Sequence, residues 1–151
     1  MFHAVAYALH LLAAVSWVGG LCYAWGVLRP ASAAVLPGAR LALYVPVLQR
    51  FLCWAWVAGL LLPASGMVVL RGRFNGFETA PRDVQWMMGG YIVMAAVFIR
   101  VHSLRLPLLR SAVAAEDWPT ASQECAQIRH WLAFNLALGV MIVALGAFGP
   151  R

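Results

Sequence analysis

Charged residues are scarce in this sequence, and lysine is absent from it. Only 11% of the 151 residues are charged, whereas soluble globular proteins have about 25%. Hydrophobic residues make up 64% of the chain, and the mean hydropathy is +0.81. This composition excludes an ordinary soluble domain and predicts a membrane protein. The net charge of +6 comes from arginine. In a membrane protein, arginine is typical of loops that lie beside lipid headgroups, so this charge does not indicate a nucleic-acid site.

The sequence lacks the residues that several classes of function require. No carboxylate lies within an apolar segment, so a proton-coupled transporter that uses a buried acid has no candidate. The sequence has no phosphate-binding loop, no CxxC pair and no nucleophile with a base at usable spacing. Cys22, Cys53 and Cys125 give no paired framework of the secreted type. Hydrolases, nucleotide-dependent proteins and disulfide scaffolds are therefore excluded.

Four apolar segments are each long enough to cross a bilayer, which takes about 20 helical residues. We predict spans at about residues 2–28, 44–70, 84–106 and 126–148, within one domain that covers residues 1–151. The first apolar run is too long for a signal-peptide core, so we expect it to remain as a span. The predicted fold class is all-α, an integral membrane four-helix bundle with the lipid bilayer as its main partner.

The distribution of arginine predicts the orientation of this bundle. The first and third connections and their helix ends hold seven arginines, namely Arg29, Arg40, Arg50, Arg100, Arg105, Arg110 and Arg129. The second connection and the C-terminus hold four, namely Arg71, Arg73, Arg82 and Arg151. The positive-inside rule then places both termini outside the cytoplasm. The expected location is the bacterial cytoplasmic membrane, as a multi-pass protein.

One ionisable side chain lies deep within a predicted span. At ~1.5 Å per residue, His10 is about 12 Å below the outer end of its helix, while Tyr91 and Met141 are about 10 Å deep. Met87 and Met88 are shallower in the same outer half. An ionisable group in a span is costly and marks a candidate functional site. Imidazole and thioether both suit Cu(I), and haem iron accepts His with His or Met, so copper and b-type haem remain alternatives.

Helical periodicity selects further candidates. His3, His10 and Trp17 recur at steps of seven and so share one stripe, which small residues flank. On the third helix, Tyr91 and His102 belong to a stripe that faces the bundle. The candidates for cofactor binding are His10, His102, Tyr91 and Trp17, and those for metal binding are His10, His3, Met87, Met88 and Met141. The alternatives are a hydrogen-bonded neutral histidine at His10, an interfacial role for His102 and simple packing of the methionines.

The segment from Leu9 to Leu21, LHLLAAVSWVGGL, resembles the opening helix of the copper-resistance protein D (CopD) family. That family is related to the HemJ-type protoporphyrinogen oxidases, whose first helix carries the same His, Trp and small-residue pair. The resemblance implies that His10 is the first-helix histidine, a copper ligand in one branch and a haem ligand in the other. The HemJ branch also has a functional lysine near the start of the third helix. Here Met87, Met88 or Tyr91 stands in that region, which disfavours protoporphyrinogen oxidation.

These observations predict a CopD-like membrane protein in copper handling, by binding or by uptake. The first alternative is a b-type haem redox protein, with His10 and either His102 or a methionine as axial ligands. The second is a structural accessory subunit of a membrane complex. Enzymatic activity is expected only in the haem case, as a membrane oxidoreductase. Copper ion or haem is the expected ligand, and a second copy or a membrane complex is left open as a protein partner.

Overall fold

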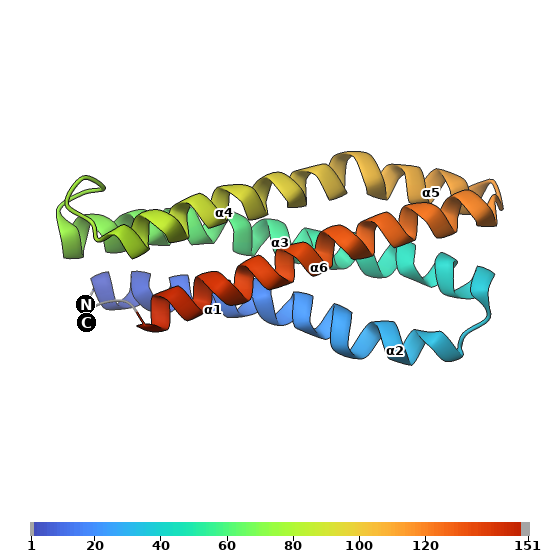
Figure 1. The fold of residues 1–151 in the computed structure, drawn as a ribbon, viewed down its shortest axis with the longest axis horizontal. Coiled ribbons are helices and arrows are strands. Elements are labelled where there is room, and N and C mark those ends of the chain that lie inside the picture. Colours follow the sequence, from blue (N-terminus) through green and yellow to red (C-terminus); the bar gives the residue numbers. More distant parts are fainter. Residues whose placement is uncertain (1, 149–151) are drawn as a thin grey trace.

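Four long helical rods make up the structure, a computed structural model that describes residues 2–148. The rods run antiparallel (Figure 1). The start of the first rod, the end of the last and the connection at residues 75–81 share one end of the bundle, and the other two connections lie at the opposite end. Each rod contains a segment long and apolar enough to cross a bilayer: His3–Ala34, Pro37–Phe74, Arg82–Ala114 and Trp118–Ala147. The predicted all-α fold with four helices long and apolar enough to span a membrane is confirmed.

Two of the rods combine several helical types. The first consists of α1 (Phe2–Tyr23), the π-helical η1 (Ala24–Leu28), α2 (Arg29–Ala31) and the 3-10 segment η2 (Ser32–Ala34). The second is α3 (Pro37–Phe74). The third consists of α4 (Arg82–Arg100), the π-helical η3 (Val101–Arg105) and α5 (Leu106–Ala114), and the fourth is α6 (Trp118–Phe148).

The rods extend beyond the apolar runs that predicted them. The sequence predicts that the first helix ends at Arg29-Pro30, but the helical rod continues to Ala34. Its π-helical segment ends two residues before Pro30, and η3 likewise ends two residues before Pro107. Proline cannot donate a main-chain hydrogen bond to the preceding turn. In each rod a wider π-helical turn precedes the proline, and the helix continues through the position that lacks the donor.

Local residues account for two of the helix ends. Asn75 takes the left-handed conformation, with φ of 58°, and terminates α3. At the start of α6, the Thr120 amide donates to Asp117 Oδ1 at 3.2 Å, which caps the helix. The hydrogen bonds from the Thr120 side chain and backbone hold the pKa of Asp117 below its ordinary value.

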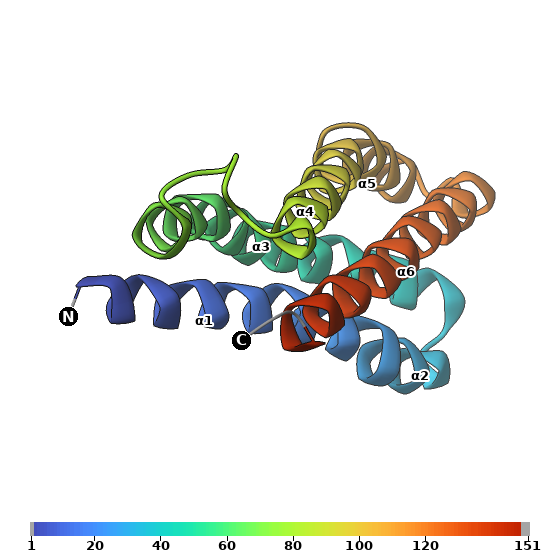
Figure 2. The same cartoon turned by 60° about the vertical axis from the view of Figure 1, so that its left-hand side comes forward.

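The bundle is built from two pairs of rods. α1 packs along α3, while α4 and α5 pack along α6, and α1 also contacts α6. Near the end that holds the termini, the two pairs diverge (Figure 2). The outer surface carries large apolar side chains, among them Trp54, which is 75% exposed. A surface of this kind suits a lipid environment, because its apolar side chains contact hydrocarbon there instead of water.

Candidate functional site

The stripe at steps of seven on α1 packs against a stripe of glycines on α3. A Cβ atom on Gly66 would lie 3.1 Å from His10 Cε1, and one on Gly59 would lie 3.0 Å from Trp17 Cζ3. Because glycine has no side chain, the two helices approach closely and the rings of α1 fill the space. The stripe faces the neighbouring helix, as predicted. The pairs are His3 with Gly72, His10 with Gly66 and Trp17 with Gly59.

The hydrogen bonds of His10 define which ring nitrogen carries the proton. Nδ1 lies 3.0 Å from the Leu62 carbonyl oxygen and 3.2 Å from Ser65 Oγ. A carbonyl oxygen only accepts, so Nδ1 is the protonated nitrogen. The Ser65 hydroxyl donates to the Leu61 carbonyl and can therefore accept from the same Nδ1–H group. Nε2 of His10 is left with a free lone pair, which is the form that binds a metal.

Met88 of α4, in the other pair of rods, lies about one helical turn from the depth of His10. Tyr91 of α4 faces α3, because its hydroxyl donates to the Gly59 carbonyl at 2.7 Å. Met88 precedes Tyr91 by three residues and so lies on the same face of α4. This position places Met88 level with Leu62, whose carbonyl holds His10. Among the candidates Met87, Met88 and Met141, Met88 is thus the one on the side of α4 that faces α3.

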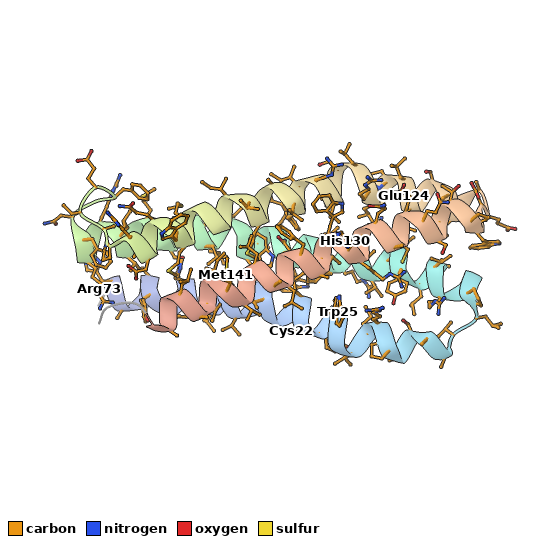
Figure 3. All side chains as sticks on the ribbon, viewed as in Figure 1. Cys22, Trp25, Arg73, Glu124, His130 and Met141 are labelled. Atoms are coloured by element: carbon orange, nitrogen blue, oxygen red, sulfur yellow. The ribbon has the colours of Figure 1, made fainter. Side chains whose placement is uncertain are left out.

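The other two candidate methionines point elsewhere. Met87 packs towards α6, where a Cβ atom on Gly146 would lie 3.2 Å from its Cε. Met141, labelled in Figure 3, is 53% exposed. Val18 packs against Gly139, which places Met141 near the depth of residue 16 rather than that of His10. The structure therefore brings neither side chain towards His10.

His102 occupies a separate aromatic site. Its ring stacks on Phe98 at a centroid distance of 6.2 Å and meets the edge of Trp56 at 5.9 Å. Its Nδ1 is buried and has no hydrogen-bond partner among the described residues. Trp56 precedes Leu62 by six residues of α3, which is about 9 Å along the helix at ~1.5 Å per residue. The structure does not bring His102 and His10 together, and in this arrangement one haem iron cannot bind both.

Between the two histidines lies a packed aromatic cluster. Trp17 meets Tyr91 edge to face at 6.2 Å and Phe98 at 5.7 Å. Only 2% of the Trp17 surface is exposed, so this candidate is part of the core. Phe98 belongs to the predicted inward stripe that also holds Tyr91 and His102, whereas sequence reasoning missed Trp56, because aromatic side chains are common in any span. The cluster separates the His10 site from the His102 site.

Tyr91 also compensates for a proline within α3. Pro63 has no amide hydrogen to donate to the Gly59 carbonyl four residues earlier, and the Tyr91 hydroxyl donates to that carbonyl instead. Tyr91→Phe should therefore lower the free energy of unfolding in detergent by about 1–3 kcal/mol, the cost of leaving a buried acceptor unpaired. In a Pro63→Ala background, the new amide can pair with Gly59, so the same change should cost less. Equal losses in the two backgrounds would contradict this account.

His3, the remaining candidate, and the three cysteines lie apart from His10. His3 is at the start of α1, beside Gly72. Cys22 and Cys53 are exposed on the bundle surface, and Cys125 is buried. Within residues 2–148, no three side chains of the types His, Cys, Asp and Glu gather closely enough to hold a metal ion. A site at His10 would therefore depend on a thioether.

Comparison of this chain with protein-family models, with curated proteins and with solved structures finds no match.

Proposed function

We propose that this protein binds Cu(I) in the outer half of the membrane and takes part in copper handling. His10 supplies an imidazole ligand through Nε2, and Met88 supplies a thioether. The likeness of residues 9–21 to the opening helix of the CopD family favours the same chemistry. No other group of ionisable side chains within the described spans offers a comparable donor set.

The hydrogen bond from His10 Nδ1 to the Leu62 carbonyl is the observation that carries this proposal. Histidines that bind metals usually donate their second ring nitrogen to a carbonyl, a carboxylate or a water, which fixes both the tautomer and the ring orientation. Here the ring is held at 3.0 Å by that carbonyl and rests against Gly66. Contacts with α3 therefore fix both the tautomer and the position of the imidazole.

The surroundings of the site favour a soft, singly charged ion. Thioether and imidazole ligands suit Cu(I), whereas hard ions such as Mg²⁺ prefer carboxylate and carbonyl oxygens. No carboxylate of the described residues forms a hydrogen bond or an ion pair with His10, and Glu124 pairs with Arg105 at 3.1 Å. A second positive charge would remain uncompensated among apolar side chains, which is costly in a membrane.

The thioether assignment predicts different effects for two methionines. Met88→Leu should weaken Cu(I) binding by about tenfold or more, because it removes a soft ligand at nearly constant volume. Met141→Leu makes the same chemical change on an exposed face and should leave the affinity unchanged. Both variants can be titrated with Cu(I) under anaerobic conditions, in competition with a chromophoric chelator. A loss of affinity in Met141→Leu, with none in Met88→Leu, would contradict the assignment.

The arginine distribution also predicts how the site is oriented in the cell. A reporter fused after Arg151 should behave as extracytoplasmic, and one inserted near Glu116 as cytoplasmic. α6 (Trp118–Phe148) crosses from one end of the bundle to the other between these two positions, so the two signals should differ. The reverse pattern would place His10 in the cytoplasmic half of the membrane and would require delivery of copper from that side.

A further inference from the structure

A narrow cleft lies at the end of the bundle opposite the His10 site, where η1, α3 and α6 meet. Leu21, Leu48 and Leu132 line one part of it, and Arg29 and Arg129 line another. Its free volume of about 30 Å³ cannot hold a whole lipid or a cofactor. A ligand of this cleft must therefore lie along its opening.

The polarity of the cleft changes along the membrane normal. From Leu21 to Arg29, the first rod advances eight residues, which is about 12 Å at ~1.5 Å per residue. The lining is apolar at the deep end and cationic towards the end of the bundle. This gradient matches a phospholipid, whose acyl chain lies in the hydrocarbon and whose phosphate lies at the interface.

The arginines of this cleft have no acidic partner in the described part of the chain. The Arg29 guanidinium lies 4.8 Å above the Trp25 ring, which holds it along the cleft. Arg129 and Arg40 are close enough to act electrostatically on Cys125. Neither they nor Arg29 form a salt bridge with any residue from 2 to 148, whereas nearby Glu124 pairs with Arg105. The cleft is thus left with an uncompensated positive charge.

We infer that this cleft binds an anionic phospholipid of the leaflet around it. The phosphate lies between Arg29 and Arg129, and an acyl chain follows the groove past Leu48 and Leu132. The positive charge favours an acidic headgroup over a zwitterionic one, because each arginine near the headgroup strengthens binding roughly fivefold. This site is independent of the proposed copper site and lies at the opposite end of the bundle.

Native mass spectrometry of the intact protein, released from mild detergent, tests this inference. We expect one phosphatidylglycerol to be retained in preference to phosphatidylcholine with the same acyl chains, by about 25-fold for two arginines. Arg29→Gln with Arg129→Gln should abolish the preference. Arg71→Gln with Arg73→Gln removes the same charge at the other end and should preserve it.

Equal retention of the two lipids by the wild-type protein would overturn the inference without any variant. A preference that survives Arg29→Gln with Arg129→Gln, or that falls equally in the control pair, would also overturn it, because binding would then reflect overall charge. If the double glutamine variant fails to accumulate, Arg29→Lys with Arg129→Lys provides a second test. This variant keeps the charge and should keep most of the preference for phosphatidylglycerol, and its loss would exclude an electrostatic site.

Discussion

Replacing His10 by alanine is expected to lower the Cu(I) affinity of the purified protein by at least about 100-fold. Loss of a partner outside the metal's ligand set typically costs 10–100-fold, so loss of the ligand itself should cost at least as much. The change removes the only imidazole at this depth, and Met88 alone leaves the ion with a single soft donor. Anaerobic competition with a chromophoric chelator measures the affinity directly.

His130→Ala is a matched control, because His130 is exposed on α6, where its ring meets the neighbouring Trp131 ring at 6.4 Å. This variant should bind Cu(I) as the wild type does. The His10→Ala variant should still reach the membrane, since His10 is half-buried and the apolar surface of α1 is unchanged. Equal affinities in the two variants would contradict the role of His10.

Replacing Trp17 by alanine should have the largest effect on stability of any change at the α1–α3 contact. The indole is 2% exposed and fills the space left by Gly59, against Tyr91 and Phe98. Truncation of a buried aromatic leaves a cavity and typically costs about 3–5 kcal/mol. Equilibrium unfolding in mixed detergent micelles, followed by circular dichroism, would measure this loss.

Trp54→Ala removes the same side chain from α3, where the indole is 75% exposed on the surface of the bundle. It should cost much less, because detergent or lipid replaces the lost contacts. A similar loss of stability in both variants would contradict the packing described for Trp17.

The four spans could be predicted because long apolar runs are a direct requirement of the bilayer. The residues at which the rods begin and end could not be predicted in this way. Arg29, Pro30 and the residues before Tyr44 are too polar or too irregular to count as membrane segments, yet their backbone continues as helix. Hydropathy reports which residues suit hydrocarbon, whereas helix formation also continues through the interface, where water and headgroups surround polar side chains.

The candidate site could be predicted in part. Spacing by seven was enough to place His10 and Trp17 on one inward face, because that relation is internal to a single helix. The opposing glycines and the Leu62 carbonyl could not be identified, since they depend on which helix lies beside α1. Depth alone grouped Met87, Met88 and Met141, but the direction of each side chain around its helix separates them. The same limit applied to His102, whose distance from His10 depends on the packing against Trp56.

X-ray absorption spectroscopy of the Cu(I)-loaded protein is the decisive test of the copper site, because it reports the atoms bound to the ion. We expect one imidazole nitrogen together with sulfur in the wild type, loss of the nitrogen contribution in His10→Ala, and loss of sulfur in Met88→Leu. An environment without nitrogen in the wild type, or one that His10→Ala leaves unchanged, would contradict the assignment of a copper site to His10.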